Sequence, residues 1–255
     1  MNQPLANPDD DMQALQLACN RLQQQCQFQA AFLGTASHEL RAPINQIISL
    51  HQLILEDLCE SPTEEREFIA QANQTMITVL KNLDTLISVS KLDIGALQPK
   101  FQTMELVLIL AMVQQLMEMK CINRHCRLSL IAEDDTLTVW TDLHWLQQAL
   151  VTLIDAALAA GSTAIYLTAQ PQDATTVRLE LICDSHPDRW FVKSPPRTST
   201  TAPSQLSLEL PLSPSFAYQM AARMMPHLQG TIVQDRSLTP EQQRICITLP
   251  QVEQL

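Results

Sequence analysis

Apolar residues recur at alternating intervals of three and four positions over residues 12–58, and again from residue 62 into the nineties. On a helix with about 3.6 residues per turn, this spacing gathers them along one stripe. The first stripe runs through Leu15, Ala18, Leu22, Cys26, Gln29, Leu33, Ala36 and Leu40, and continues through Ile44 and Ile47. The second runs through Ile69, Ala72, Met76, Val79, Leu83 and Leu86. The pattern therefore predicts two long helices.

The segment Ser61-Pro62-Thr63-Glu64 separates these helices and is typical of a helix start. Serine is a common N-cap, proline is favoured at the first helical position, and glutamate three residues after the cap completes a capping box. We therefore expect a short turn and a helical hairpin.

After Gly95 the pattern changes to short strands that alternate with helices. Helices are predicted over residues 104–122, 142–160 and 214–228. Strands are predicted over residues 127–131, 137–140, 164–169, 177–183, 231–233 and 245–249. Residues 185–214 are rich in proline, serine and threonine, and are predicted to form a mobile loop. This order favours a layer of helices on a mixed sheet, an α+β two-layer sandwich.

These elements suggest three parts: a disordered lead over residues 1–11, a helical domain over residues 12–98 and an α+β domain over residues 99–255. One hairpin cannot bury such a long apolar stripe, but two hairpins can as a four-helix bundle. We therefore expect a homodimer. Packing of the stripe against the second domain of the same chain is the alternative.

Composition narrows the class of protein. The formal net charge is −11, from 16 basic and 27 acidic residues, so a nucleic-acid partner is not expected. The longest apolar run, from Leu106 to Val113, is shorter than the ~20 residues of a membrane span. No signal peptide opens the sequence, so we expect a cytoplasmic location and no membrane span.

The seven cysteines are an odd number, which favours reduced thiols over a disulfide framework. Cys121, His125 and Cys126 lie close together in the sequence. A closed structural zinc site needs four ligands, and no second cysteine pair is present, so no metal site is expected.

The segment Ser37-His38-Glu39-Leu40-Arg41-Ala42-Pro43-Ile44 carries the candidate chemistry. His38 lies off the apolar stripe, so it is expected to point away from the bundle seam. Pro43 removes the helical hydrogen bond to the carbonyl of Glu39, so any kink falls beside His38. Imidazole titrates near pH ~6.5 and is a neutral nucleophile, and a neighbouring carboxylate can hold its proton.

This segment closely resembles the H-box of two-component histidine kinases. The resemblance implies that His38 is the phospho-acceptor and that Glu39 orients its ring and takes part in proton transfer. Arg41 and Pro43 would be supporting residues of the motif. The family often has threonine or asparagine where Ala42 stands, and that residue helps to orient water for dephosphorylating the partner. Alanine cannot do so, and the resemblance therefore does not extend to phosphatase activity.

The order of elements over about residues 12–250 also resembles the kinase hairpin followed by the ATP-binding domain. The nucleotide helix of the family carries two asparagines, of which the second binds magnesium, and then a lysine. Thr152, Ala156 and Ala159 stand at these positions. Alanine has no side-chain oxygen for Mg²⁺.

The family aspartate that binds the adenine amino group is kept as Asp184. The Gly-x-Gly turn after it is replaced by Ser185-His186-Pro187-Asp188, and the later glycine-rich phosphate loop falls at Ser215-Phe216-Ala217-Tyr218. Side chains there block the approach of phosphate to backbone N–H groups. We therefore expect neither ATP nor Mg²⁺ unless a diverged site still functions. Asp184 is then a weak remnant of the adenine site, or simply a solvated aspartate at a strand end.

The resemblance implies a role in phosphorelay. His38 would accept a phosphoryl group from the aspartate of a response-regulator receiver domain or from a partner kinase and pass it on, as kinase-derived histidine phosphotransferases do. Autokinase activity is not expected. One alternative is an active sensor kinase with a diverged ATP site. The other is a non-catalytic pseudokinase scaffold that binds a receiver or another kinase.

Overall fold

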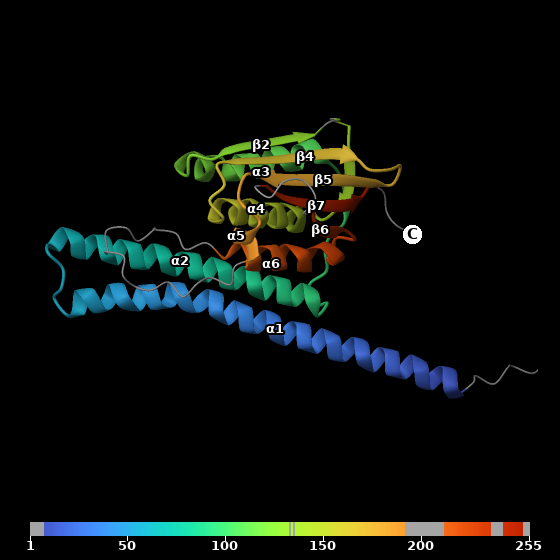
Figure 1. Ribbon diagram of the computed structural model, residues 1–255, viewed down its shortest axis with the longest axis horizontal. Coiled ribbons are helices and arrows are strands. Elements are labelled where there is room, and N and C mark those ends of the chain that lie inside the picture. The colour runs from blue at the N-terminus through green and yellow to red at the C-terminus, as the bar shows by residue number, and fades with distance from the viewer. Residues whose placement is uncertain (1–7, 133, 135, 192–211, 236–241, 252–255) are drawn as a thin grey trace, which may run out of the picture. The chain divides into compact units, whose positions relative to one another are not determined.

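A computed structural model describes residues 8–132, 134, 136–191, 212–235 and 242–251, apart from most side chains of residues 8–28. Contacts within the chain divide it into two units, residues 1–42 and 43–255, and each is described by itself. Helix α1, Pro8–Leu55, crosses this boundary, and helix α2 spans Pro62–Asp93. Both helices of the predicted hairpin are therefore confirmed (Figure 1).

The start of α2 has the predicted Ser61 cap, but the Glu64 carboxylate bonds to the N–H of Glu60 rather than to that of Ser61, as a capping box would require. The Glu64 backbone N–H donates to the Ser61 hydroxyl at 3.2 Å, and the Glu60 N–H donates to the Glu64 carboxylate at 2.6 Å. The Ser61 cap thereby satisfies one backbone donor that the first turn of the helix leaves without a partner. The other helix, α1, begins at Pro8, four residues before the predicted start, and continues through Pro43.

The apolar stripes are not buried as single units. In α2, Ala72, Val79 and Leu86 are buried at seven-residue intervals. Ile69, Met76 and Leu83, between them at the same interval, are between 39% and 50% exposed. Alternate residues of the stripe are therefore buried and exposed, so the stripe has one side in contact with the rest of the chain and one side open to solvent.

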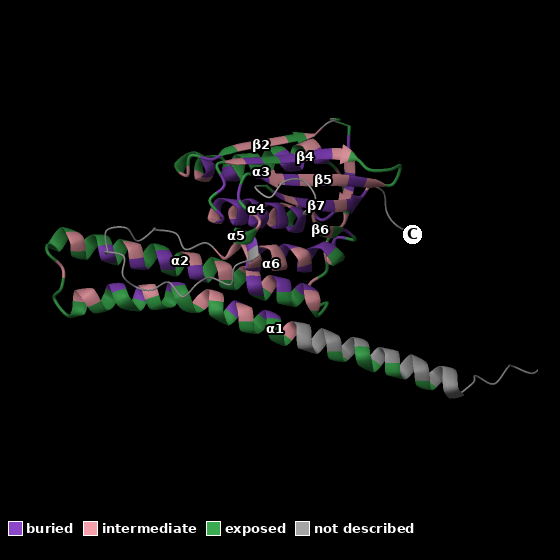
Figure 2. Cartoon of the chain, viewed as in Figure 1, coloured by how far each residue is buried: buried purple, intermediate pink, exposed green. Residues whose placement is uncertain are grey.

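The stripe predicted for α1 is divided in the same way. Ala36 and Ile47 are buried, whereas Leu33 is 62% and Ile44 41% exposed. Within a single chain the stripe is therefore only partly buried, as expected for a hairpin that cannot cover its whole apolar face by itself. Figure 2 shows exposed residues along both helices.

The second half of the chain alternates strands and helices. They are β1 Gln102–Glu105, α3 Leu106–Asn123, β2 Arg127–Ala132, β3 Thr138–Thr141, α4 Leu143–Ala159, β4 Ala164–Pro171, β5 Thr176–Cys183, α5 Asp188–Phe191, α6 Pro214–His227, β6 Thr231–Asp235 and β7 Gln243–Pro250. Strand β1 and helix α5 were not predicted. Of the predicted loop, residues 192–211 lie outside the described residues.

A five-stranded sheet with the order β2-β4-β5-β7-β6 forms the core of this region. Strand β2 is parallel to β4, and the other neighbours are antiparallel. Strands β1 and β3 form a separate antiparallel pair. The predicted mixed sheet with its helix layer, an α+β sandwich, is confirmed (Figure 1).

Alternation along the strands sets the two faces of the sheet. In β5, Val177, Leu179, Leu181 and Cys183 are buried, and the residues between them are partly exposed. Helices follow one another across the layer, because α3 contacts β2 and α4, α4 contacts α6, and α6 contacts α2. At the last of these contacts, the Asp93 carboxylate accepts a hydrogen bond from Arg223 and lies 3.1 Å from Nε2 of His227.

Among the described residues, α3 is the one helix with the length and composition of a membrane span. One side of it is buried in this domain, through Leu106, Ile109, Leu110, Val113, Met117 and Cys121. This side of α3 packs on β2 and α4.

Candidate functional site

The first candidate site lies on α1. His38 is exposed and Glu39 is partly exposed, whereas Ala36, two positions before His38, is buried. The expectation that the imidazole points away from the buried side is therefore confirmed. An exposed imidazole can be reached by a phosphorylated protein partner.

The backbone around His38 remains helical. The Ser37 hydroxyl donates to the Leu33 carbonyl at 2.8 Å, and the Thr35 hydroxyl donates to the Ala31 carbonyl at 3.0 Å. Such bonds satisfy short polar side chains within a helix. Pro43 is buried, and proline has no backbone N–H to donate within the helix. Arg41 and Ala42 are exposed, on the same stretch as His38.

A second candidate site is the nucleotide region of the α+β domain. On α4, the Thr152 hydroxyl donates to the Gln148 carbonyl at 2.7 Å, and Ala156 is buried. Ala159, at the position of the family lysine, is the last residue of α4. Asp155, a carboxylate on the same helix, lies 2.8 Å from Nζ of Lys120. The face that carries magnesium ligands in the family is therefore short of oxygen atoms.

Asp184 follows β5, as expected, and is bonded to its own domain. Its carboxylate accepts hydrogen bonds from the Thr163 N–H at 2.8 Å, the Ala164 N–H at 3.1 Å and the Thr163 hydroxyl. Burial opposes the charge, but these hydrogen bonds outweigh it and lower the pKa of the carboxyl. These contacts give Asp184 a structural role in joining the start of β4 to the end of β5.

Helix α5 fills space next to Asp184. Trp190 is almost completely buried, and its indole N–H donates to the buried Ser185 hydroxyl at 3.0 Å. Arg189 donates to the Ala160 carbonyl, just past α4, at 3.0 Å. Gly161 has a φ of +82°, and a Cβ there would lie 2.7 Å from the Arg189 guanidinium. The turn that is glycine-rich in the family is therefore packed with side chains of this chain.

The segment that matches the phosphate loop is helical. The Phe216 N–H donates to the Ser213 hydroxyl at 3.3 Å at the start of α6, and Phe216 and Ala217 are buried. Burial raises the pKa of Tyr218. No flexible glycine backbone is presented here.

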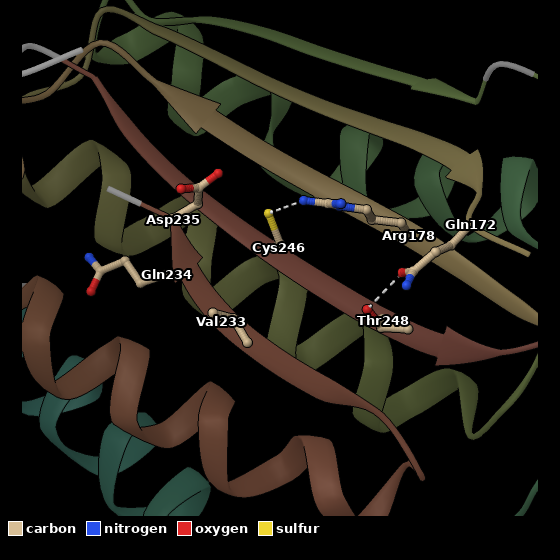
Figure 3. A pocket seen from close by; sticks show the side chains of 7 residues that line it. All are labelled: Gln172, Arg178, Val233, Gln234, Asp235, Cys246 and Thr248. Atoms are coloured by element: carbon tan, nitrogen blue, oxygen red, sulfur yellow. Dashed lines mark hydrogen bonds between the residues drawn. The ribbon is translucent and has the colours of Figure 1, made fainter. Parts of the chain in front are cut away.

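A shallow hollow of about 280 Å³ lies on the opposite, helix-free face of the sheet (Figure 3). Arg178 donates to Sγ of Cys246 at 3.1 Å and pairs with Glu180 at 2.9 Å. Thr248 donates to the Gln172 amide oxygen at 3.2 Å. These side chains bond to one another, and Asp184 is not among the residues that line the hollow.

The cysteine and histidine cluster noted in the sequence lies at the end of α3. Cys121 and Cys126 are buried. Burial, and then the neighbouring Cys121, raise the pKa of the Cys126 thiol to about 11. Within the described part of the chain, no three His, Cys, Asp or Glu side chains are arranged to hold a metal ion.

The family model that matches this chain covers part of its helical region. Residues 28–95 match the model of the His Kinase A (phospho-acceptor) domain, and this range includes His38. The chain therefore carries a region that is similar to the phospho-acceptor domain of histidine kinases. It is similar to Histidine kinase 1 of Arabidopsis thaliana, at 26% identity over 118 residues. It is also similar to the cell-division control histidine kinase PdhS of Brucella anthropi, at 31% identity over 77 residues.

These matches cover 46% and 29% of this chain, but only 10% and 7% of the two histidine kinases. Solved structures share the fold over more of the chain. Histidine kinase AdeS of Acinetobacter baumannii aligns with a TM-score of 0.63 at 14% identity, over 85% of this chain and 98% of that one. Histidine kinase ThkA, in complex with the response regulator protein TrrA, aligns with a TM-score of 0.58 at 15% identity, over 90% and 64%.

The site residues predicted from the sequence therefore fall into two groups. His38, Glu39, Arg41 and Pro43 lie together on α1, whereas Asp184 directly follows β5. Sequence reasoning missed the packing of Arg189 and Trp190. The signal was Asp188-Arg189-Trp190-Phe191, two aromatic residues within a polar, proline-rich stretch.

Proposed function

We propose that this chain relays phosphoryl groups through His38 in two-component signalling, without using ATP itself. The observation that carries the proposal is His38, exposed on α1 within the matched phospho-acceptor range and flanked by the complete motif. Neutral imidazole attacks the phosphorus of an aspartyl phosphate on a receiver domain. A P–N bond forms, the P–O bond to the aspartate breaks, and the carboxylate leaves.

Glu39 would assist by holding the proton of the imidazole. Transfer to His38 increases the positive character of the ring, and a neighbouring carboxylate stabilises that charge. The step is reversible, so the phosphoryl group can pass to a second receiver. Ala42 offers no polar group to orient water, which favours transfer over hydrolysis.

The second half of the chain supports a route that does not begin with ATP. Thr152 and Ala156 stand where the family has its asparagines, and Asp184 is engaged by Thr163 and Ala164. We propose that neither ATP nor Mg²⁺ is a cofactor. In this view the domain is a folded support for the hairpin, and the phosphoryl group comes from a receiver or a partner kinase.

We further propose that two chains pair through the hairpin. Apolar side chains between 39% and 81% exposed remain on residues 43–93: Ile44, Ile48, Leu55, Ile69, Met76, Ile77, Leu80, Leu83 and Ile87. Exposure of so much apolar surface is unfavourable in a soluble monomer. Two hairpins that face each other would bury these residues in a four-helix bundle.

The test uses the full chain and receiver domains phosphorylated with a labelled small-molecule phosphodonor. We expect acid-labile label on the chain, and its complete loss in His38→Gln. His51→Gln is the matched control, because His51 is also an exposed histidine of α1. The His51→Gln variant should be labelled as strongly as the unsubstituted chain. If tight binding to a receiver occurs without any labelling, the scaffold interpretation replaces the relay. If ATP alone labels His38, the sensor-kinase interpretation replaces it.

A further inference from the structure

Helix α3 is apolar on the side away from its own domain as well as on the side that packs. Five large side chains of this outer side are between 40% and 66% exposed: Leu108, Met112, Leu116, Met119 and Ile122. Their spacing of four, four, three and three residues places them on one face of a helix. We call these five residues the outer stripe.

The outer stripe lies at the end of the helix layer. Helix α6 contacts α2 in addition to α4, whereas α3 contacts α4 and the edge strand β2. Each residue of the outer stripe is at least 40% exposed, so no described helix or strand covers the outer stripe. A surface helix of a soluble domain ordinarily carries charged or polar residues there.

The outer stripe contains no charge. Glu118 and Lys120 are the charged residues of α3, and Lys120 pairs with Asp155 of α4 at 2.8 Å. The five side chains expose on the order of 500 Å² of apolar surface, a patch size that often marks an interaction site. A standard protein interface buries roughly 800 Å² on each partner, so the outer stripe can supply its apolar centre.

The residue types along the outer stripe have nearly the same order in both directions. From either end the stripe has an aliphatic residue, a methionine, Leu116, a methionine and an aliphatic residue. In an antiparallel pair centred near Leu116, Leu108 faces Ile122 of the other copy and Met112 faces Met119. An interface with twofold symmetry requires such self-complementarity.

We propose that the outer stripe is an interface with a second copy of this chain, formed by antiparallel packing of two α3 helices. A lipid surface fits less well, because the chain has a net charge of −11 and anionic leaflets attract basic segments. Together with pairing through the hairpin, this second twofold interface would join two dimers into a tetramer or link dimers into longer chains.

The first test compares two charge substitutions on α3. Leu116→Glu places a charge at the centre of the outer stripe, and Gln114→Glu places the same charge at an exposed position beside it. We expect sedimentation of the full chain at high micromolar concentration to show the mass reduced by at least half by Leu116→Glu and unchanged by Gln114→Glu. Circular dichroism checks that both variants are folded. Equal masses for Leu116→Glu and the unsubstituted chain, or a loss of mass in both variants, would overturn the proposal.

The second test uses the symmetry axis. Leu116→Cys should cross-link two copies under mild oxidation by a disulfide reagent, because the two substituted side chains face each other. Gln114→Cys should give at least tenfold less cross-linked product. Flotation with neutral and with anionic vesicles tests whether the outer stripe binds a lipid surface instead of a second copy. Vesicle binding lost in Leu116→Glu, without any change in mass, would replace the second copy by a membrane. This readout does not involve His38, so it is independent of the proposed relay.

Discussion

The helical hairpin and the α+β domain differ in what each keeps of a histidine kinase. On α1 the segment Ser37–Ile44 resembles the family motif apart from Ala42, and His38 is exposed. In the α+β domain the strand order and helix layer are kept, while Ala156 is buried at a ligand position and Trp190 fills space beside Asp184. A fold can therefore outlast the polar groups that bind a ligand, because apolar side chains stabilise the same packing.

The largest expected effect tests whether this contrast holds for nucleotide. Calorimetric titration of the full chain with ATP and magnesium should show no saturable binding in the micromolar range. A Kd of about 1 μM corresponds to a binding free energy of about 8 kcal/mol, and such binding would saturate within the titration. The reason is the lack of an oxygen ligand at Ala156 and the engagement of Asp184 by Thr163 and Ala164. Saturable, magnesium-dependent binding would show that the α+β domain still has a nucleotide site, and would favour the interpretation as an active sensor kinase.

The second prediction concerns the packing that stands beside Asp184. Trp190→Ala should lower the free energy of unfolding by about 3–5 kcal/mol, because a large buried side chain and its hydrogen bond to Ser185 are lost. Chemical denaturation monitored by circular dichroism measures this. Trp190→Phe keeps most of the volume and should cost markedly less.

The same variant sharpens the comparison. If Trp190 merely blocked an intact pocket, Trp190→Ala would gain ATP binding. We expect no gain, because Ala156 still has no side-chain oxygen and the Thr152 hydroxyl is bonded to the Gln148 carbonyl. Nucleotide binding by the variant would show that the site is occluded rather than lost.

Much of the fold was predictable because its signals are local. The Ser61 cap, the glycine after α4 and the alternation in β5 each depend on a few adjacent residues. The H-box is also local, so all of its residues could be named from the sequence.

Other features depend on contacts between distant residues. Asp93 and Arg223 are 130 residues apart and meet only when α6 packs on α2. Strand β1 is four residues long and is defined by its pairing with β3. The division of the α2 stripe into buried Val79 and exposed Met76 depends on which side has a neighbour. A spacing rule identifies an apolar face, but it does not say what covers that face.

The third prediction concerns the exposed apolar residues of the hairpin. Met76→Glu should weaken self-association through the hairpin by roughly a hundredfold, about 3 kcal/mol, because pairing would bury an unpaired charge. Gln74→Glu adds the same charge at an exposed polar position of α2 and is the matched control. Concentration-dependent sedimentation of both variants, each also carrying Leu116→Glu, isolates the hairpin contact. Equal association constants would show that the exposed apolar residues do not pair.

The smallest expected effect uses two helix starts of the same chemistry, one in each region. Ser61 precedes Pro62 at the start of α2, and Ser213 precedes Pro214 at the start of α6. Each hydroxyl accepts one backbone N–H, at 3.2 Å from Glu64 and 3.3 Å from Phe216. Replacing either serine by alanine leaves that donor without its cap and should cost about 1 kcal/mol.

The position of the loss distinguishes the two regions. Hydrogen exchange should show faster amide exchange in the first turns of α2 for Ser61→Ala, and in the first turns of α6 for Ser213→Ala. If the α+β domain acts as a support for the hairpin, Ser213→Ala should leave the rate of phosphoryl transfer to His38 unchanged while the domain remains folded. A slower transfer in Ser213→Ala, without global unfolding, would indicate that the domain takes a direct part in the reaction.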